Sequence, residues 1–157
     1  MPILDFDEFA TFISSAPKNG AIFGIDNGEK NIGIAVSDLT RLIASPQSAV
    51  KRGKFSETAA AIFKIFDAKE CIAYVVGHPI NMDGSSGPSA QAARAFARNL
   101  ASLRDVPILM ADERLSTSAV QRQMIDADVS RKSRAIKVDS AAAAFVLQGV
   151  LDRLRSF

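Results

Sequence analysis

Apolar residues occur along this chain in two alternating arrangements, short continuous runs and longer stretches with helical spacing. Five runs have the length and flanking turn residues that are typical of buried strands. They lie at residues 22–25, 32–36, 42–50, 71–77 and 106–110. The run at 42–50 is expected to be irregular, because Pro46 cannot donate a hydrogen bond to a strand ladder.

The stretches around these runs carry apolar residues every three or four positions, as one face of a helix requires. They predict helices at about residues 3–15, 56–68, 88–103, 116–125 and 138–157. Residues 126–137 are polar and basic without any period, so we expect a loop there.

After the first helix the predicted order is β-β-β-α-β-α-β-α-α, and the last two strands are apolar throughout. Such strands need helices on both faces of their sheet. The order predicts an α/β fold with a mixed five-stranded sheet, in which three antiparallel strands precede parallel βα units. This is the ribonuclease H-like arrangement. Residues 1–20 are predicted to be an N-terminal helical extension, and residues 21–157 the ribonuclease H-like domain.

The amino-acid composition excludes only a few classes of protein. The chain has 157 residues, of which 48% are apolar and 23% charged, and a net charge of +2 that permits a nucleic-acid partner without favouring one. The single cysteine, Cys71, excludes an internal disulfide and is expected to be buried. No apolar run approaches the length of a membrane span, and the acidic start of the chain lacks the basic region of a signal peptide. We therefore expect a cytoplasmic protein with no membrane partner.

The residue that most needs an explanation is Asp26. It ends the first apolar run and is followed by Asn27-Gly28, a strong signal for a hairpin turn because both residues tolerate positive φ. A charge at the end of a buried strand is costly unless something pairs with it, and a metal ion is a common partner. Asp26 is therefore a candidate metal ligand, although it could also simply open the turn.

Two further acids occupy comparable positions. Glu113, with Asp112 beside it, follows the last strand, and Asp139 lies in the first turn of the last helix on its apolar stripe. Sites in open α/β sheets form beyond the carboxyl ends of strands, where convergent carboxylates suit one or two Mg²⁺ or Mn²⁺ ions. Two such ions can support phosphodiester cleavage. Asp26, Glu113 and Asp139 are thus the predicted catalytic residues and metal ligands.

Each of these acids also has an ordinary structural role open to it. Asp139 could cap its helix or interact with the helix dipole, and taken alone that role is favoured. Asp112 and Glu113 could be surface charges paired with Arg114. The metal interpretation depends on the three positions meeting at one edge of the sheet.

Basic residues near the acids are candidates for nucleic-acid binding. They are Lys30, Arg114, Arg131, Lys132, Arg134 and Lys137. The last four form the densest basic cluster of the chain, and a grip on a phosphate backbone is preferred there over a solvated loop. His78, the only histidine, is expected to line the pocket or satisfy a loop carbonyl rather than act as a general base.

Three blocks of sequence together resemble the YqgF family, also called RuvX. They read GIDNGEKNIGIAVSD from residue 24, VVGHPINMDGS from residue 75, and DERLST from residue 112, continued by SRK at 130–132 and by Asp139 with Ala142-Ala143 and Leu147-Gln148. The resemblance covers roughly residues 21–152. The family is described both as Holliday junction resolvases and as pre-16S rRNA processing nucleases.

The resemblance implies a ribonuclease H-like fold and a metal-dependent nuclease acting in ribosomal RNA maturation, with the family's acidic positions on Asp26, Glu113 and Asp139. Two residues depart from the family pattern. Asn31 stands where the family usually has arginine, which could weaken the grip on the substrate. His78 stands where it usually has leucine, which could alter the pocket.

The leading hypothesis is a Mg²⁺- or Mn²⁺-dependent endonuclease that trims the 5′ end of precursor 16S rRNA, with a pre-ribosomal particle as a further partner. Asp26 would bridge the metals, and residues 128–137 would hold the nucleic-acid backbone. The alternatives are a Holliday junction resolvase that cleaves branched DNA, a non-catalytic nucleic-acid-binding module of the same fold and, on a weaker signal, an ATP-using relative. The sequence leaves open whether the protein is a monomer or a homodimer.

Overall fold

The computed structural model, which describes residues 3–16, 19–78, 87–112 and 131–157, holds a seven-stranded sheet in the order β1-β7-β6-β2-β3-β4, with β5 also paired to β3. The strands are β1 (Ile3–Leu4), β2 (Ala21–Asn27), β3 (Asn31–Ser37), β4 (Ala44–Pro46), β5 (Val50–Lys51), β6 (Cys71–His78) and β7 (Ile108–Asp112). β3, β4 and β5 form the antiparallel part, and β2, β6, β7 and β1 run parallel. The mixed ribonuclease H-like sheet is confirmed.

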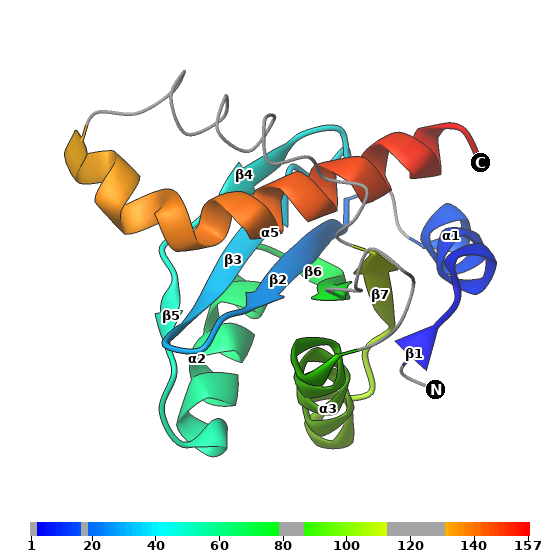
Figure 1. The fold of residues 1–157 in the computed structure, drawn as a ribbon. Helices are drawn as coiled ribbons and strands as arrows, with labels where there is room; N and C mark the ends of the chain where they lie inside the picture. The colour runs from blue at the N-terminus through cyan, green and yellow to red at the C-terminus, as the bar shows by residue number, and fades with distance from the viewer. Residues whose placement is uncertain (1–2, 17–18, 79–86, 113–130) are drawn as a thin grey trace.

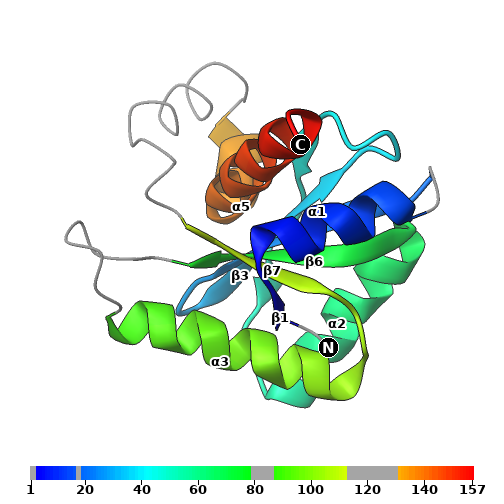
Figure 2. The ribbon, with the colours of Figure 1, turned by 90° about the vertical axis from the view of Figure 1, so that its right-hand side faces the viewer.

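The described helices cover both faces of this sheet, as the apolar strands require. They are α1 (Phe6–Ser15), α2 (Phe55–Ala68), α3 (Pro88–Leu103) and α5 (Arg131–Arg155). α5 lies across one face (Figure 1), with α1 on the same side, and α2 and α3 cover the other face (Figure 2). Among the described helices, none is both long and apolar enough to cross a membrane.

The sheet has seven strands and not the five predicted. The predicted strand at 42–50 is two short pieces, because β4 ends at Pro46 and the ladder with β3 resumes only at Val50. The other addition is β1, whose two residues pair with β7 at the edge of the sheet. A strand of two residues is too short to leave a pattern in the sequence, so only its pairing reveals it.

The expectation of a loop through residue 137 is wrong from Arg131 onward, because α5 begins there. Residues 131–137 contain no glycine or proline and consist mainly of good helix formers. They lack an apolar stripe, but a stripe is needed only where a helix packs on a core. The predicted helix at 116–125 lies outside the described residues.

The N-terminal segment packs closely against the sheet. Asp5 caps α1, accepting a hydrogen bond from the backbone N–H of Glu8 at 2.8 Å. Phe9 and Ile13 of this helix are buried in the core on the α5 side. The division of the chain into an extension and a domain at residue 20 stays a prediction.

The cores on the two faces differ in residue type. The α2 and α3 side holds an aromatic cluster in which Phe66 stacks on Tyr74 at 4.6 Å between ring centroids, and Phe23 meets Tyr74 edge-on at 5.5 Å. The α5 side uses small residues where helix and sheet meet. They are Ala35, Ala73, Ala111, Ala143 and Ala144. Small side chains let the long helix lie close to the strands.

Candidate active site

Three parallel strands end at one edge of the sheet, where sites of open α/β folds form. The register of β2 and β6 brings Gly77 level with Asp26. The register of β6 and β7 pairs His78 with Asp112. The edge therefore carries one carboxylate at the end of β2, one at the end of β7 and the only histidine between them.

Asp26 lies on the α5 side of β2. Alternate residues of a strand point to the same face, and both Ile22 and Gly24 face α5. Ile22 is buried in the α5-side core, and a Cβ added to Gly24 would lie only 3.1 Å from Cβ of Leu147. Asp26 follows two residues later and is half-buried. Its carboxylate is thus directed to the face that α5 covers.

The two strand neighbours of Asp26 are both glycines. Gly33 lies directly across on β3, and Gly77 is the next residue along β6 after the last pair shared with β2. Neither places a side chain beside the carboxylate. Glycines in strands often mark positions where a ligand or another backbone approaches closely. Asp26 therefore has the surroundings of a ligand-binding carboxylate rather than of a core charge.

α5 brings residue 139 toward the same strand end. The hydroxyl of Ser140 accepts a hydrogen bond from the backbone N–H of Ile34 at 3.0 Å, and Ile34 pairs with Ile25, the residue before Asp26. One turn further on, the carbonyl oxygen of Ala143 would lie 3.2 Å from a Cβ on Gly24. The backbone of α5 thus passes the end of β2 at residues 139–140.

The remaining predicted ligand and most of the basic candidates lie outside the residues or side chains that the structure describes. Glu113 and Arg114 lie outside the described residues. The basic residues between 131 and 137 lie on the first turns of α5, and their side chains, like that of Asp139, are not described. Among the described side chains, no three of His, Cys, Asp or Glu gather around a common point. The three-acid site stays a prediction.

The hairpin turn beside Asp26 is braced by an arginine. Arg52 donates from Nε to the carbonyl of Gly28 at 3.1 Å and from its guanidinium to the side-chain oxygen of Asn27, and its guanidinium carbon lies 5.7 Å from the ring centre of Phe96. Gly28 is required in this turn, since a Cβ there would lie 2.4 Å from the carbonyl oxygen of Asn31. Arg52 therefore stabilises the turn. Lys30, two residues beyond Gly28, is exposed.

His78 faces away from Asp26. It lies on the α3 side, where its side chain lines a pocket with Arg94 and Arg98 of α3. Burial lowers the pKa of His78, the charge of Arg94 lowers it further, and that of Asp112 opposes the shift. His78 therefore lines a pocket on the face opposite Asp26, and not the pocket of the predicted acidic site. The sequence analysis missed both arginines, although their spacing of four residues on one helix marks a shared face.

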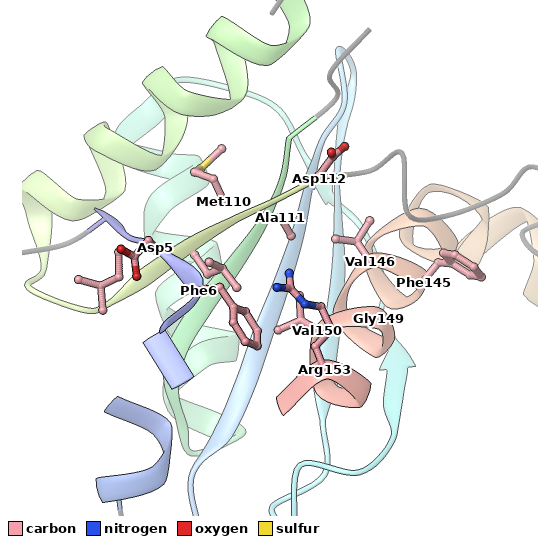
Figure 3. A pocket seen from close by; sticks show the side chains of 12 residues that line it. Asp5, Phe6, Met110, Ala111, Asp112, Phe145, Val146, Gly149, Val150 and Arg153 are labelled. Carbon is pink, nitrogen blue, oxygen red and sulfur yellow. The ribbon is translucent and has the colours of Figure 1, made fainter. Parts of the chain in front are cut away.

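A separate cavity of about 200 Å³ begins at Asp112 and runs down β7 between α5 and the start of α1 (Figure 3). Its walls are mostly apolar, with Met110 and Val146 among them. At the far end the guanidinium carbon of Arg153 lies 3.8 Å above the ring of Phe6. The cavity links the end of β7 to the N-terminal segment.

Comparison of the sequence with known protein families identifies the family to which this chain belongs. Residues 20–153 match the family model described as "RuvX: Holliday junction resolvase". The chain belongs to the RuvX family. The resemblance in the three sequence blocks is thereby confirmed, and the protein is a hydrolase of the nuclease class.

Relatives of this RuvX protein extend over its whole length. It is 49% identical over 157 residues to a protein of Caulobacter vibrioides (strain NA1000) that is provisionally named pre-16S rRNA nuclease, covering 99% of both chains. It is 47% identical over 156 residues to a Rhizobium meliloti protein with the same provisional name, covering 99% of this chain and 93% of that one.

A solved structure confirms the fold of the RuvX chain. T. thermophilus RuvC, determined in complex with a Holliday junction substrate, superposes with a TM-score of 0.55 at 15% identity, over 87% of this chain and 97% of RuvC.

The two positions that depart from the RuvX pattern both lie near the candidate site. Asn31 begins β3, and His78 ends β6.

Proposed function

We propose that this RuvX protein is a divalent-metal-dependent endonuclease that processes the 5′ end of precursor 16S rRNA. The observation that carries the proposal is Asp26, a half-buried carboxylate at the end of a central strand. On each of the two adjacent strands the residue beside it is a glycine. The nearly full-length relatives provisionally named pre-16S rRNA nucleases support the choice of substrate. We expect it to act in the cytoplasm on a pre-ribosomal particle.

The donor set fits a hard divalent cation such as Mg²⁺ or Mn²⁺, because carboxylate oxygens are the ligands these ions prefer. Asp26, Glu113 and Asp139 would hold it. A bound ion would supply charge stabilisation at the phosphate and an activated water. The protein's own contribution is to fix Asp26 on a strand in the middle of the sheet, with Gly33 and Gly77 as its neighbours on the adjacent strands.

The experiment compares the wild type with Asp26→Asn on a labelled RNA that spans the mature 5′ end of 16S rRNA. Cleavage should require Mg²⁺ or Mn²⁺ and should be lost in the variant. Asp7→Asn, which changes an exposed acid on α1, is the matched control and should cleave normally. Titration calorimetry with Mn²⁺ on the same three proteins tests the metal site directly. Full cleavage by Asp26→Asn would overturn the mechanism.

A second candidate function is cleavage of branched DNA. It is favoured by the family description and by the fold likeness to RuvC, which was solved with a Holliday junction substrate. Offering a four-way DNA junction and the precursor RNA fragment to the same preparation separates the two. Faster cleavage of the junction than of the RNA would replace the first proposal by the second. Oligomeric state should be measured in parallel, since a resolvase acts as a dimer.

A further inference from the structure

The second polar site of the molecule lies on the face opposite Asp26. A pocket of about 430 Å³ opens between the end of β6 and residues 90–98 of α3. Its lining consists of His78, Ala90, Gln91, Arg94 and Arg98. All of these except the alanine carry groups that can donate hydrogen bonds.

His78 supplies a buried nitrogen without a partner. Its side chain belongs to a residue only 6% exposed, and its Nε2 has no hydrogen-bond partner among the described residues. Buried polar atoms are nearly always paired, so an orphaned one that lines a pocket calls for an explanation. A ligand that accepts a hydrogen bond from Nε2 provides one.

The two arginines of the pocket are also unusual in their surroundings. α3 contains no acidic residue, and Arg94 and Arg98 are its only charged side chains. Both are exposed, and neither forms an ion pair with the residues that the structure describes. Like charges one helical turn apart repel each other, and an anion between them would turn this repulsion into attraction.

We propose that His78, Gln91, Arg94 and Arg98 bind a phosphate of the nucleic-acid backbone at a position away from the bond that is cut. Guanidinium groups match phosphate oxygens with paired N–H donors, and a neutral imidazole protonated at Nε2 adds a further donor. β6 lies between β2 and β7, so the pocket adjoins the strand ends that carry Asp26 and Asp112. The proposal rests on the proposed function, because it assigns a contact to that substrate.

His78 makes the test unusually direct, because it is the only histidine in the chain. Untagged full-length protein labelled with ¹⁵N-histidine gives only the two ring-nitrogen signals of His78, and the one assigned to Nε2 is the imidazole signal followed here. The signal is followed in EDTA, so that no cleavage occurs, while three probes are added in turn. They are a short single-stranded RNA, a nucleoside monophosphate and inorganic phosphate.

RNA should shift the imidazole signal in a saturable way and at lower concentration than either small probe. The double variant Arg94→Gln/Arg98→Gln should lose the shift and bind RNA about tenfold more weakly, with a shallower dependence on salt because fewer phosphates are neutralised. Lys64→Gln, an exposed lysine on α2, is the control and should behave as the wild type. His78→Leu should weaken binding several-fold while the thermal midpoint is retained.

Two results would overturn the proposal. One is RNA binding that leaves the imidazole signal unmoved. The other is a signal that responds to inorganic phosphate or the monophosphate while RNA does not compete, since the pocket would then take a small phosphorylated molecule. Failure of the proposed function is recognised separately, as an absence of metal-dependent cleavage in a wild type whose imidazole signal still responds to RNA.

Discussion

The two faces of the sheet share one set of strand ends but are built from different residues. On the α5 face, alanines and Gly24 let the helix backbone reach the strands, and the Ser140 hydroxyl meets the N–H of Ile34. On the other face, large aromatic residues fill the space under α2 and α3. The close approach of a helix backbone to the strands is therefore found on the side that carries Asp26.

The difference explains how one edge can hold two kinds of polar site. Because strand residues alternate between faces, Asp26 is directed toward α5 and His78 toward α3, although they end neighbouring strands. The close helix on the α5 side brings residue 139 to the end of β2. The α3 side instead offers a pocket with two arginines. We therefore predict that the α5 face carries the cleavage site and that the α3 face binds the nucleic-acid backbone.

The largest expected effect tests that division in the kinetics. Asp26→Asn should lower kcat about 100-fold or more, since metal-assisted charge stabilisation is worth several kcal/mol. Arg94→Gln/Arg98→Gln should mainly raise KM, because a distant phosphate contact binds the substrate and the transition state alike. Steady-state cleavage of the precursor RNA fragment measures both. Equal losses of kcat in the two variants would contradict the prediction that only the α5 face carries the cleavage site.

Much of this arrangement could be predicted from the sequence. The apolar runs gave the positions of β2, β3, β6 and β7 because a buried strand must be apolar on both sides. Cys71 is buried as predicted, and burial raises the pKa of its thiol to about 12. The position of Asp26 at a strand end followed from the abrupt stop of its apolar run and the Asn27-Gly28 turn after it.

What could not be predicted depends on contacts between distant segments. β1 exists only because its two residues pair with β7, and α5 begins at Arg131 although its first turns have no apolar stripe in the sequence. The pocket of His78, Arg94 and Arg98 requires the packing of α3 beside the end of β6. No local pattern in the sequence encodes that packing. The three-acid site depends equally on such contacts and stays a prediction.

The next largest effect concerns the hydrogen bond between the hydroxyl of Ser140 on α5 and the backbone N–H of Ile34 on β3. Ser140→Ala should lower the free energy of unfolding by about 2 kcal/mol, because it leaves the buried N–H of Ile34 without an acceptor. Urea unfolding of both proteins measures the change. Ser102→Ala is the control, since that hydroxyl bonds a carbonyl of its own helix end at the surface, and its effect should be small. A loss no larger than that of the control would show that the Ser140 bond contributes little to the stability of α5 on the sheet.

A pair of glycines tests the close approach of α5 with one chemical change. Gly24→Ala should destabilise the protein by about 1–2 kcal/mol, because its Cβ would lie 3.1 Å from Leu147 Cβ and 3.2 Å from the Ala143 carbonyl. Gly149→Ala, in the middle of α5, meets nothing within 4 Å and should stabilise by about 0.5–1 kcal/mol through better helix propensity. Thermal unfolding of both variants gives the signs. The same sign for both would contradict a tight contact at Gly24.

The smallest effect concerns the loop that α5 holds beside β4. Gln148 of α5 donates a hydrogen bond to the carbonyl of Leu42 and accepts one from the backbone N–H of Ala44. In the same loop the carboxylate of Asp38 accepts hydrogen bonds from the backbone N–H groups of Leu42 and Ile43, both at 2.8 Å. The bond from Ile43 is the largest cause that lowers the pKa of Asp38 from 3.8 to about 2. A carboxyl with a lowered pKa adds stability above its unfolded pKa and loses that contribution as the pH falls toward the folded value.

Asp38→Asn should therefore cost about 1 kcal/mol near neutral pH, less than the full pKa shift implies because water screens an exposed carboxylate. Urea unfolding at several pH values should show the gap between variant and wild type closing between about pH 4 and pH 2. A gap that stayed constant across this range would mean that Asp38 acts through the shape of its hydrogen bonds alone. In that case the α5 face would be held without any contribution from charge at this loop.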